Sequence, residues 1–589
     1  MKVLFFAPHS ALWVHAFPEA LVAESLQQCG HEVIYVGCGK ALQSYCVPMA
    51  AHGLRWDSEG PLKAEVCNTC DRYKSIIRSR FDFKGHDLSS FITEEDNKVA
   101  ESFVSSATRD NLLTLNFERL EVGRYALYSL LIKKKKSQLK FSDQEWDEYR
   151  TSLHTTVLAA IGGRRILDKE KPDILVVYNS LYSVNRVCVE LAKASGIVPY
   201  FLHAGGNFSN RLQTLILARD DWFAFTQRQI EYWREHSESP CGADELASVT
   251  DHFAELFQGR SAFVYSAAPS RDYVDVRSFF GIGQGQRILL ATMSSYDELF
   301  AAQLIRVMPE CQGILFPQQV DWIKAVSEFV SERPDLFLII RVHPREFPNK
   351  REGEKSEHAS AMEEVFRELP PNVRVNWPAD SLSLYDLAEE ADVVLNAWSS
   401  AGKEMGLFGL PVVSYAPQLL AYPPELNYIG ETVNAYFACI DQALHDGWSM
   451  ENIRKGYRWH SLELKSSLID ISDSYSHSES KRPGSTLQGA FHAVGRRLVS
   501  SFDQHRDCAR RARHLASAEL INRVVMSRAP SVLTFHADQQ RQTVTLAEET
   551  VILRTELRRL VRARYGRETT TTSHRRTLKK RLIECSTAD

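Results

Sequence analysis

The sequence predicts an α/β protein made of two Rossmann-like domains followed by a basic helical extension. Two series of alternating strands and helices carry this prediction, the first starting at Met1 and the second near Arg287. Such alternation is typical of a parallel sheet with right-handed crossovers. A chain of 589 residues is also too long for a single core, so more than one domain is expected.

The first domain opens with an apolar strand, an amphipathic helix and a second apolar strand. Residues 2–7 form the first strand and residues 15–29 the helix. Further buried strands are predicted at 31–37, 173–178 and 198–203. A charged helical region of about 80 residues separates the second strand from the third.

The second domain repeats the pattern at closer spacing. Its strands are predicted at 288–292, 336–342, 373–375, 392–396 and 411–415. Ligands of open α/β sheets bind beyond the carboxyl ends of the strands. Residues that directly follow these strands are therefore the first candidates for a site.

Composition changes divide the chain into three parts. We expect an N-terminal acceptor domain over 1–265, a nucleotide-sugar domain over 266–473 and a helical, partly disordered extension over 474–589. From residue 476 onward the extension holds 22 Lys and Arg but only 11 Asp and Glu. Four of its leucines follow part of a heptad pattern, Leu546, Leu553, Leu557 and Leu560. The basic charge suits binding to an anionic membrane, whereas the leucine pattern favours a coiled-coil dimer as the alternative role of the extension.

Charge and cysteine usage indicate a cytoplasmic protein. The formal net charge is −4, which argues against general nucleic-acid binding. No apolar run reaches the 18 or so residues that a membrane span needs, and the short N-terminal run lacks a cleavage site. Eleven cysteines without a framework suit a reducing compartment. We expect a cytoplasmic location, and the basic extension makes the inner membrane face a candidate site of peripheral binding.

The strand at 336–342 ends in two side chains that can carry positive charge. Arg341 and His343 alternate along the strand, so both can face one side, and Pro344 stops the strand. An arginine offers a fork of donors to phosphate oxygens, and a histidine can add one more. The alternative is a surface strand end with incidental charge.

A second motif follows the strand at 392–396. Ser399, Ser400 and Gly402 stand where a helix should begin, and Glu404 lies one turn into it. Free backbone N–H groups at a helix start favour an anion, and a carboxylate there could hold ribose hydroxyls. A simple serine cap with an acidic first turn is the alternative. Ser294 and Ser295, which follow the strand at 288–292, join the predicted donor site.

With these motifs the chain resembles glycosyltransferases of the GT-B fold, in particular bacterial capsule and surface-polysaccharide biosynthesis proteins. The matching segments are 123–128, 203–207, 316–322, 341–346 and 396–411. The resemblance covers roughly residues 1–470, and its His-Pro element is shared with Kdo-transferring capsule enzymes and teichoic-acid polymerases. It implies two facing Rossmann-like domains, with donor diphosphate and ribose at Arg341, His343 and Glu404.

The catalytic base is expected on the first domain, and no metal is expected. His15 and His203 are the candidates for activating the acceptor, because they lie at a predicted helix start and strand end. The chain contains no Asp-x-Asp triplet, so the leaving diphosphate would be stabilised without a metal or other cofactor. Cys67 and Cys70 form one Cys-x-x-Cys pair without a second, so ordinary reduced thiols are favoured over zinc.

The function expected from these observations is sugar transfer from a nucleotide sugar to a surface polysaccharide or lipid-linked glycan. A polyol-phosphate transferase of the CDP-glycerol type is the nearest alternative. A non-catalytic scaffold of polysaccharide assembly is another. The expected partners are the nucleotide sugar and the glycan or lipid-linked acceptor. An anionic membrane surface and a second copy of the chain are further candidate partners.

Overall fold

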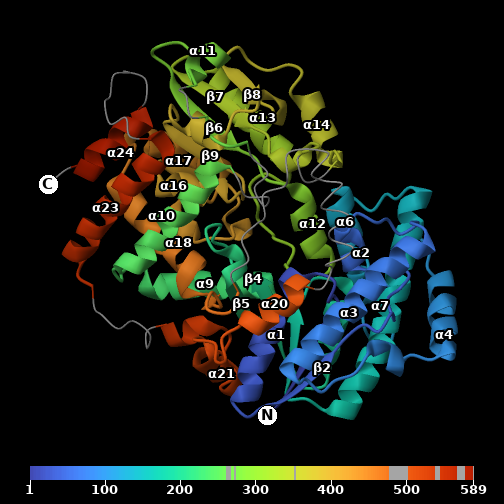
Figure 1. Cartoon of the computed structure of the whole chain (residues 1–589). Helices are drawn as coiled ribbons and strands as arrows, with labels where there is room; N and C mark the ends of the chain where they lie inside the picture. The colour runs from blue at the N-terminus through green and yellow to red at the C-terminus, as the bar shows by residue number, and fades with distance from the viewer. Residues whose placement is uncertain are drawn as a thin grey trace, which may run out of the picture.

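The computed structural model describes residues 1–259, 267–270, 274–349, 353–475, 502–536, 544–566 and 577–587. Within these residues the strands form two six-stranded sheets. Figure 1 shows the two halves of the molecule, with the blue helices of the first around one sheet and the yellow and orange helices of the second around the other. The predicted fold class, α/β with two Rossmann-like domains, is confirmed.

The first sheet has the strand order β12-β5-β4-β3-β1-β2. Its strands are β1 (Lys2–Phe6), β2 (Glu32–Val36), β3 (Ile174–Tyr178), β4 (Val198–Ala204), β5 (Thr214–Arg219) and β12 (Ile469–Asp470). The strands β1 to β4 run parallel, whereas β5 is antiparallel to β4 and β12 to β5. The carboxyl ends of β1, β3 and β4 therefore meet at one edge.

The second sheet is parallel throughout, with the order β11-β10-β9-β6-β7-β8. Its strands are β6 (Arg287–Thr292), β7 (Leu336–Arg341), β8 (Val373–Asn376), β9 (Val393–Asn396), β10 (Val412–Ser414) and β11 (Tyr428–Ile429). Apolar clusters cover both of its faces, as expected for a parallel sheet. This burial explains why its strands read as continuous apolar runs rather than alternating ones.

The helices up to residue 258 are α1 (Trp13–Gln28), α2 (Val47–Ala51), α3 (Gly60–Phe81), α4 (Glu94–Ser105), α5 (Val122–Tyr125), α6 (Tyr128–Lys134), α7 (Asp143–Glu170), α8 (Ser183–Ala194), α9 (Trp222–His236) and α10 (Ala243–Gln258). The long α7 begins with a capping box, in which Ser142 and Glu145 satisfy each other's backbone N–H groups. One face of α7 is buried against α8 and the first sheet, and this packing stabilises so long a helix.

The remaining helices before residue 476 are α11 (Val276–Phe280), α12 (Tyr296–Leu304), α13 (Gln319–Ser331), α14 (Glu357–Val365), α15 (Leu384–Ala388), α16 (Ala401–Leu407), α17 (Val433–Asp446) and α18 (Met450–Ser461). The helix α10 packs in the core of the second half, although the predicted boundary places it in the first domain. The domain boundaries themselves stay predictions.

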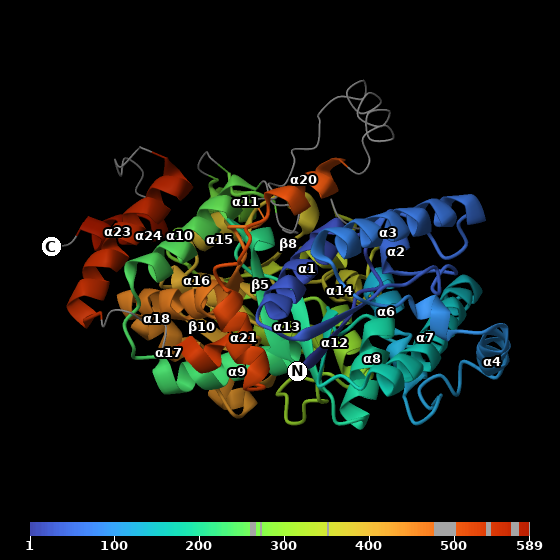
Figure 2. The ribbon, with the colours of Figure 1, turned by 60° about the horizontal axis from the view of Figure 1, so that its bottom comes forward.

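The C-terminal extension is built into both halves. Its described helices are α20 (Phe502–Arg510), α21 (Ala518–Met526), α23 (Leu546–Tyr565) and α24 (Thr577–Thr587). Cys508, Ile521 and Val524 lie in the core beneath the first sheet. Figure 2 shows α21 against α1 and α20 beside α3, while α23 lies beside α10 and α24 packs on α23.

Two expectations about this extension are wrong. Leu553, Leu557 and Leu560 are at most 1% exposed because they pack inside the second core, so they cannot form a dimer seam. Only Leu546 of the four points outward. The disorder predicted for part of the extension does not apply to residues 577–587, which form a helix because Leu578 and Leu582 complete the same core.

No described helix is both long and apolar enough to cross a membrane.

Candidate active site

Three neighbouring strands of the second sheet end at the same level. Thr292 of β6 stands opposite Arg341 of β7 on one side and Asn396 of β9 on the other. The residues that follow these strands therefore meet at one edge. They include the predicted donor residues Ser294, Ser295, His343, Ser399 and Ser400.

Arg341 is buried at the end of β7. Its guanidinium donates hydrogen bonds to the Asn376 side-chain oxygen at 2.7 Å and to the Leu382 carbonyl at 3.0 Å. Burial lowers the pKa of Arg341 to about 10, so it stays positive at neutral pH. Beside it lies a cavity of about 750 Å³ that is also lined by Phe347 and Trp377. A fixed cation thus borders a cavity with aromatic walls.

His343 directly precedes the short turn of helix at Pro344–Glu346. Its Nδ1 accepts the backbone N–H of Arg345 at 3.3 Å. Burial lowers the pKa of His343, so the ring is neutral at pH 7. A neutral ring that accepts at Nδ1 carries its proton on Nε2. The ring therefore carries a hydrogen-bond donor at Nε2.

Glu404 lies near Arg341, and two hydroxyl groups hold its carboxylate. Tyr385 donates to Oε2 at 2.7 Å, and Ser400 lies 3.4 Å from Oε1. Burial raises the pKa of Glu404, although Lys403 and these hydroxyl groups oppose the rise. The negative charge of Glu404 in turn acts to raise the pKa of Arg341, against the lowering by burial. The predicted donor residues of β7 and α16 therefore belong to one electrostatic cluster.

The serines have mainly local partners. The Ser399 hydroxyl accepts the Ala401 N–H at 3.3 Å, which is a capping contact. The Ser294 backbone is held on both sides by the Gln319 side chain, at 2.8 and 2.9 Å, and Ser295 donates to Glu298 at 3.0 Å. These contacts rigidify the edge.

The carboxyl edge of the first sheet carries a group of histidines around Tyr178, the last residue of β3. The His15 ring stacks on the Tyr178 ring with centroids 4.2 Å apart, and His203 lies at 6.1 Å from the same ring. Burial lowers the pKa of His15 to about 3 and of His203 to about 4. The structure thus brings together the two residues predicted as candidate bases. His9 joins them, with a buried Nε2 that has no hydrogen-bond partner among the described residues.

Buried hydrogen bonds from two cationic side chains join the two halves. Lys135, at the end of α6 in the first half, donates to the backbone carbonyls of Arg345 and Glu354 in the second. The Arg345 guanidinium forms an ion pair with Asp297 at 2.8 Å and donates to the Ile132 carbonyl at 3.0 Å. Arg345 and Lys135 are each 1% exposed, so this contact fixes how the halves meet.

Sequence reasoning missed several residues of this arrangement. Tyr385, which holds Glu404, and Trp377, which lines the cavity, carry no motif that would single them out. Lys135 belongs to Lys133-Lys134-Lys135-Lys136, which reads as a solvated helix end. Its burial depends on the second half of the chain, so no local signal could have found it.

The cysteines form no described disulfide or metal centre. Cys67 and Cys70 are free thiols, and burial raises the pKa of Cys70 to about 12. Across the described ranges, no cluster of three or more His, Cys, Asp or Glu residues could hold a metal ion.

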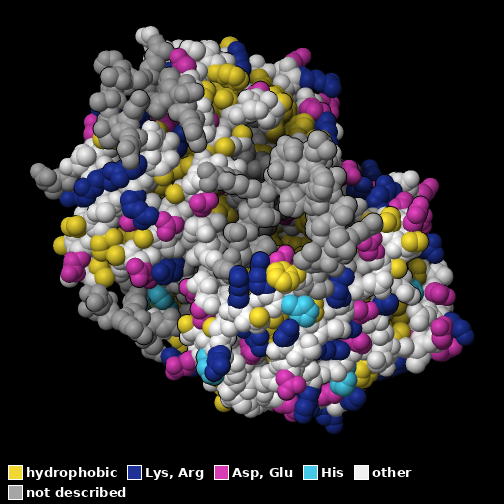
Figure 3. All heavy atoms as spheres, viewed as in Figure 1, with side chains coloured by type: hydrophobic (Ala, Val, Ile, Leu, Met, Phe, Trp, Pro, Cys, Tyr) yellow, Lys and Arg dark blue, Asp and Glu magenta, His cyan; other side chains and the backbone are white. Residues whose placement is uncertain are grey.

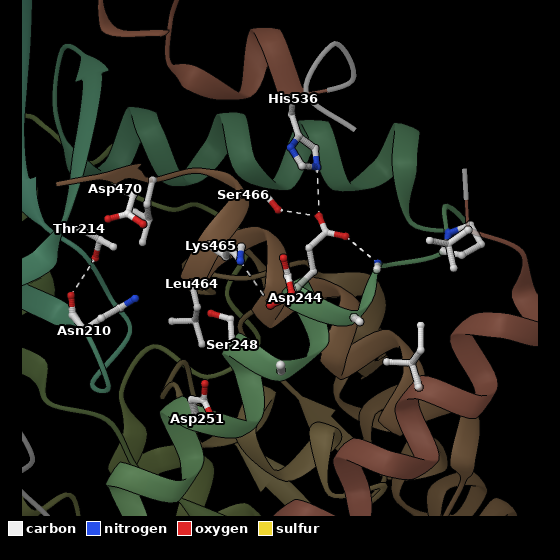
Figure 4. Close-up of a pocket in the computed structure, with 18 of the residues that line it drawn as sticks. Asn210, Thr214, Asp244, Ser248, Asp251, Leu464, Lys465, Ser466, Asp470 and His536 are labelled. Carbon is white, nitrogen blue, oxygen red and sulfur yellow. Dashed lines mark hydrogen bonds and ion pairs between the residues drawn. The ribbon is translucent and has the colours of Figure 1, made fainter. Parts of the chain in front are cut away.

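A larger hollow of about 1250 Å³ lies outside this site, between α10, β12 and the extension. Figure 4 shows its acidic side chains, among them Asp244, Asp251 and Asp470. Glu245, in the same wall, accepts from Ser466 at 3.2 Å and lies 3.6 Å from His536 of the extension. The extension thus closes one side of an acidic hollow.

Comparison with known proteins gives weak likenesses only. No family model matches the chain, and no curated protein matches it. A β-Kdo 2,4 transferase, KpsC from Thermosulfurimonas dismutans, is 16% identical over 49% of this chain and 88% of its own, with a TM-score of 0.29. A UDP-GlcNAc 2-epimerase from Neisseria meningitidis, bound to UDP-GlcNAc, is 12% identical over 78% and 97%, with a TM-score of 0.26. The glycosyltransferase SnogD from Streptomyces nogalater is 13% identical over 79% and 95%, with a TM-score of 0.20. TM-scores of this size carry no argument about function.

Proposed function

We propose that this chain is a glycosyltransferase that moves a sugar from a nucleotide sugar to a surface polysaccharide or lipid-linked glycan. One observation carries the proposal: Arg341 lies at the carboxyl edge of the second sheet within electrostatic reach of both His343 and Glu404, and it borders a cavity with aromatic walls. This is the edge at which open α/β sheets bind ligands.

The donor would occupy the second half. Arg341 supplies a fixed positive charge and His343 a hydrogen-bond donor for the diphosphate, and both would stabilise the charge that grows on the leaving group. Glu404, held in place by Tyr385, would accept hydrogen bonds from ribose hydroxyls. The cavity lined by Trp377 has room for a nucleobase next to the Arg341 charge.

The acceptor would bind at the first half. His15 and His203 are neutral at pH 7 because burial lowers their pKa values, and a neutral imidazole can take a proton from an acceptor hydroxyl. No step of this proposal requires a metal ion or another cofactor. We propose a cytoplasmic location, with the acceptor presented at the inner membrane face.

Turnover with a panel of donors tests the function. We expect a nucleotide sugar to raise the thermal midpoint and to be consumed when a glycan acceptor is added. A polyol-phosphate transferase would use a CDP-polyol alone, and a scaffold would consume no donor. Either result would overturn the proposal.

A further inference from the structure

The helix α20 is fixed rigidly to the first half of the molecule. The Trp13 indole donates to Asp507 at 2.8 Å, and the Arg511 guanidinium binds both Glu24 oxygens at 2.8 to 3.1 Å. Arg511 also lies over the Phe81 ring of α3, 4.2 Å from its centroid. The inner side of α20 is therefore fully used in packing.

The outer side of α20 is basic and carries an exposed aromatic ring. Phe502, Arg506 and Arg510 recur at a spacing of four residues, so they share one face, and all three are exposed. Phe502 is 62% exposed. Arg513 is exposed just beyond the end of α20. Arg80 of α3 lies beside α20, with its guanidinium 3.3 Å from the Nδ1 of His505. In the view of Figure 3, dark blue and yellow side chains gather over the position of α20.

The other basic helix of the extension, α23, stands in a different electrostatic setting. Its Arg559 is paired with Asp251, and its first turns line the acidic hollow of Figure 4. A negatively charged surface that approached α23 would meet Asp244, Asp251 and Glu548. On α20, Asp507 is turned inward to Trp13, whereas the exposed Asp503 forms an ion pair with Arg506 at 3.1 Å. Three exposed arginines, Arg506, Arg510 and Arg513, therefore stand against one exposed acid on this face, which keeps it net positive.

We propose that the α20 face, defined by Phe502, Arg506, Arg510 and Arg513, docks on a bilayer rich in anionic lipid. Arginines gain energy near anionic headgroups, and an exposed aromatic ring inserts at the headgroup boundary. The helix α1 is tied to α20 through Trp13 and carries His15 in its first turn. Docking would therefore bring the histidine edge of the first sheet close to the membrane. The proposal does not depend on the proposed sugar transfer.

The test is sedimentation of the full chain with vesicles of equal parts phosphatidylglycerol and phosphatidylcholine. The variant R506E/R510E should bind about thirtyfold or more weakly, which corresponds to about 1 kcal/mol for each arginine. R558E/R562E on α23 is the matched control, because it changes the same charges at the same spacing on an exposed helix face. R558E/R562E should bind the vesicles like the wild type, and high salt should weaken vesicle binding by both of these proteins.

Two further measurements separate a membrane from other partners. F502S should weaken vesicle binding without any change of charge, and vesicles of phosphatidylcholine alone should bind poorly. Equal binding by R506E/R510E and wild type, or an equal loss in R558E/R562E, would overturn the proposal. Binding of inorganic polyphosphate as tight as vesicle binding, with F502S unaffected, would also overturn it in favour of a soluble polyanion. Thermal midpoints show that each variant is folded.

Discussion

The Tyr385 hydroxyl donates a hydrogen bond of 2.7 Å to the Glu404 carboxylate. Tyr385 belongs to α15 and Glu404 to α16, so the helices that precede and follow β9 in the chain together fix this carboxylate before any ligand arrives. A carboxylate held in this way loses little freedom on binding. The contact pre-orients the carboxylate that the sequence predicts as a ligand of ribose hydroxyls.

The substitution Glu404→Gln should weaken nucleotide binding, because the ribose hydroxyls would lose a charged acceptor. We expect a loss of about 1.5–3 kcal/mol by calorimetry, and a smaller loss of about 0.5–1.5 kcal/mol for Tyr385→Phe. Glu364→Gln, at an exposed position of α14, is the control. Unchanged affinity in Glu404→Gln would show that the carboxylate only stabilises the start of α16.

Removing the cationic and hydrogen-bonding groups at the end of β7 should slow the reaction. Arg341→Ala and His343→Ala should each cost about 2–4 kcal/mol in kcat/KM, as expected for losing an electrostatic donor to the leaving group. Arg374→Ala on the neighbouring strand serves as a control, since this arginine is exposed. Near-normal turnover in folded His343→Ala protein would remove this residue from the site even if Arg341→Ala failed to fold.

Folding stability should fall as the pH drops below about 6.5. Burial lowers the pKa of His9, His252 and His460 to about 3 in the folded chain. Between about pH 3 and 6.5 the unfolded chain therefore binds protons that the folded chain does not, at up to about 1.4 kcal/mol per pH unit for each histidine. Urea midpoints at pH 7.5, 6 and 5 measure the slope, and His460→Gln should make it shallower. A flat profile would contradict the neutral buried histidines.

Turnover should not depend on a divalent cation. In the proposed reaction, Arg341 and His343 would stabilise the leaving diphosphate without one. Activity measured after exhaustive treatment with a chelator should match that of untreated enzyme. Loss of activity that magnesium or manganese restores would refute this expectation.

The extension should be needed for folding, because α23 is fixed by a buried ion pair. Arg458 donates to both Glu549 oxygens at 2.7 and 2.9 Å, and both side chains are at most 3% exposed. Glu549→Ala leaves the arginine charge buried and should cost about 3–5 kcal/mol of unfolding free energy. Glu519→Ala, at an exposed position of α21, is the control and should change little.

The same packing predicts the effect of truncation. A chain ending near residue 475 should be less stable than the full chain, because α20, α21, α23 and α24 contribute buried side chains to the two cores. Denaturation curves of such a chain should show a lower midpoint or no cooperative transition. A truncated chain as stable as the full one would contradict the packing described for α23 and α24.

The sequence determined the parts of this protein that depend on local pattern. Apolar runs placed β1, β3, β6, β7 and β9 close to their observed bounds, because strands buried on both faces must be apolar throughout. Strand ends then pointed to Arg341, His343 and Glu404, because the carboxyl edge of a parallel sheet gathers whatever follows its strands.

Only the tertiary structure decided which side chains face one another across long stretches of chain. Lys135 reads as a solvated lysine and lies buried against Arg345, 210 residues later. Leu553 and Leu557 read as half of a dimer seam and instead complete a core. A heptad fragment or a lysine run has the same local pattern whether its partner is water, a second chain or a distant segment. Which partner such a segment contacts depends on the apolar surface that the whole chain buries when it folds. A short stretch of sequence does not contain that information.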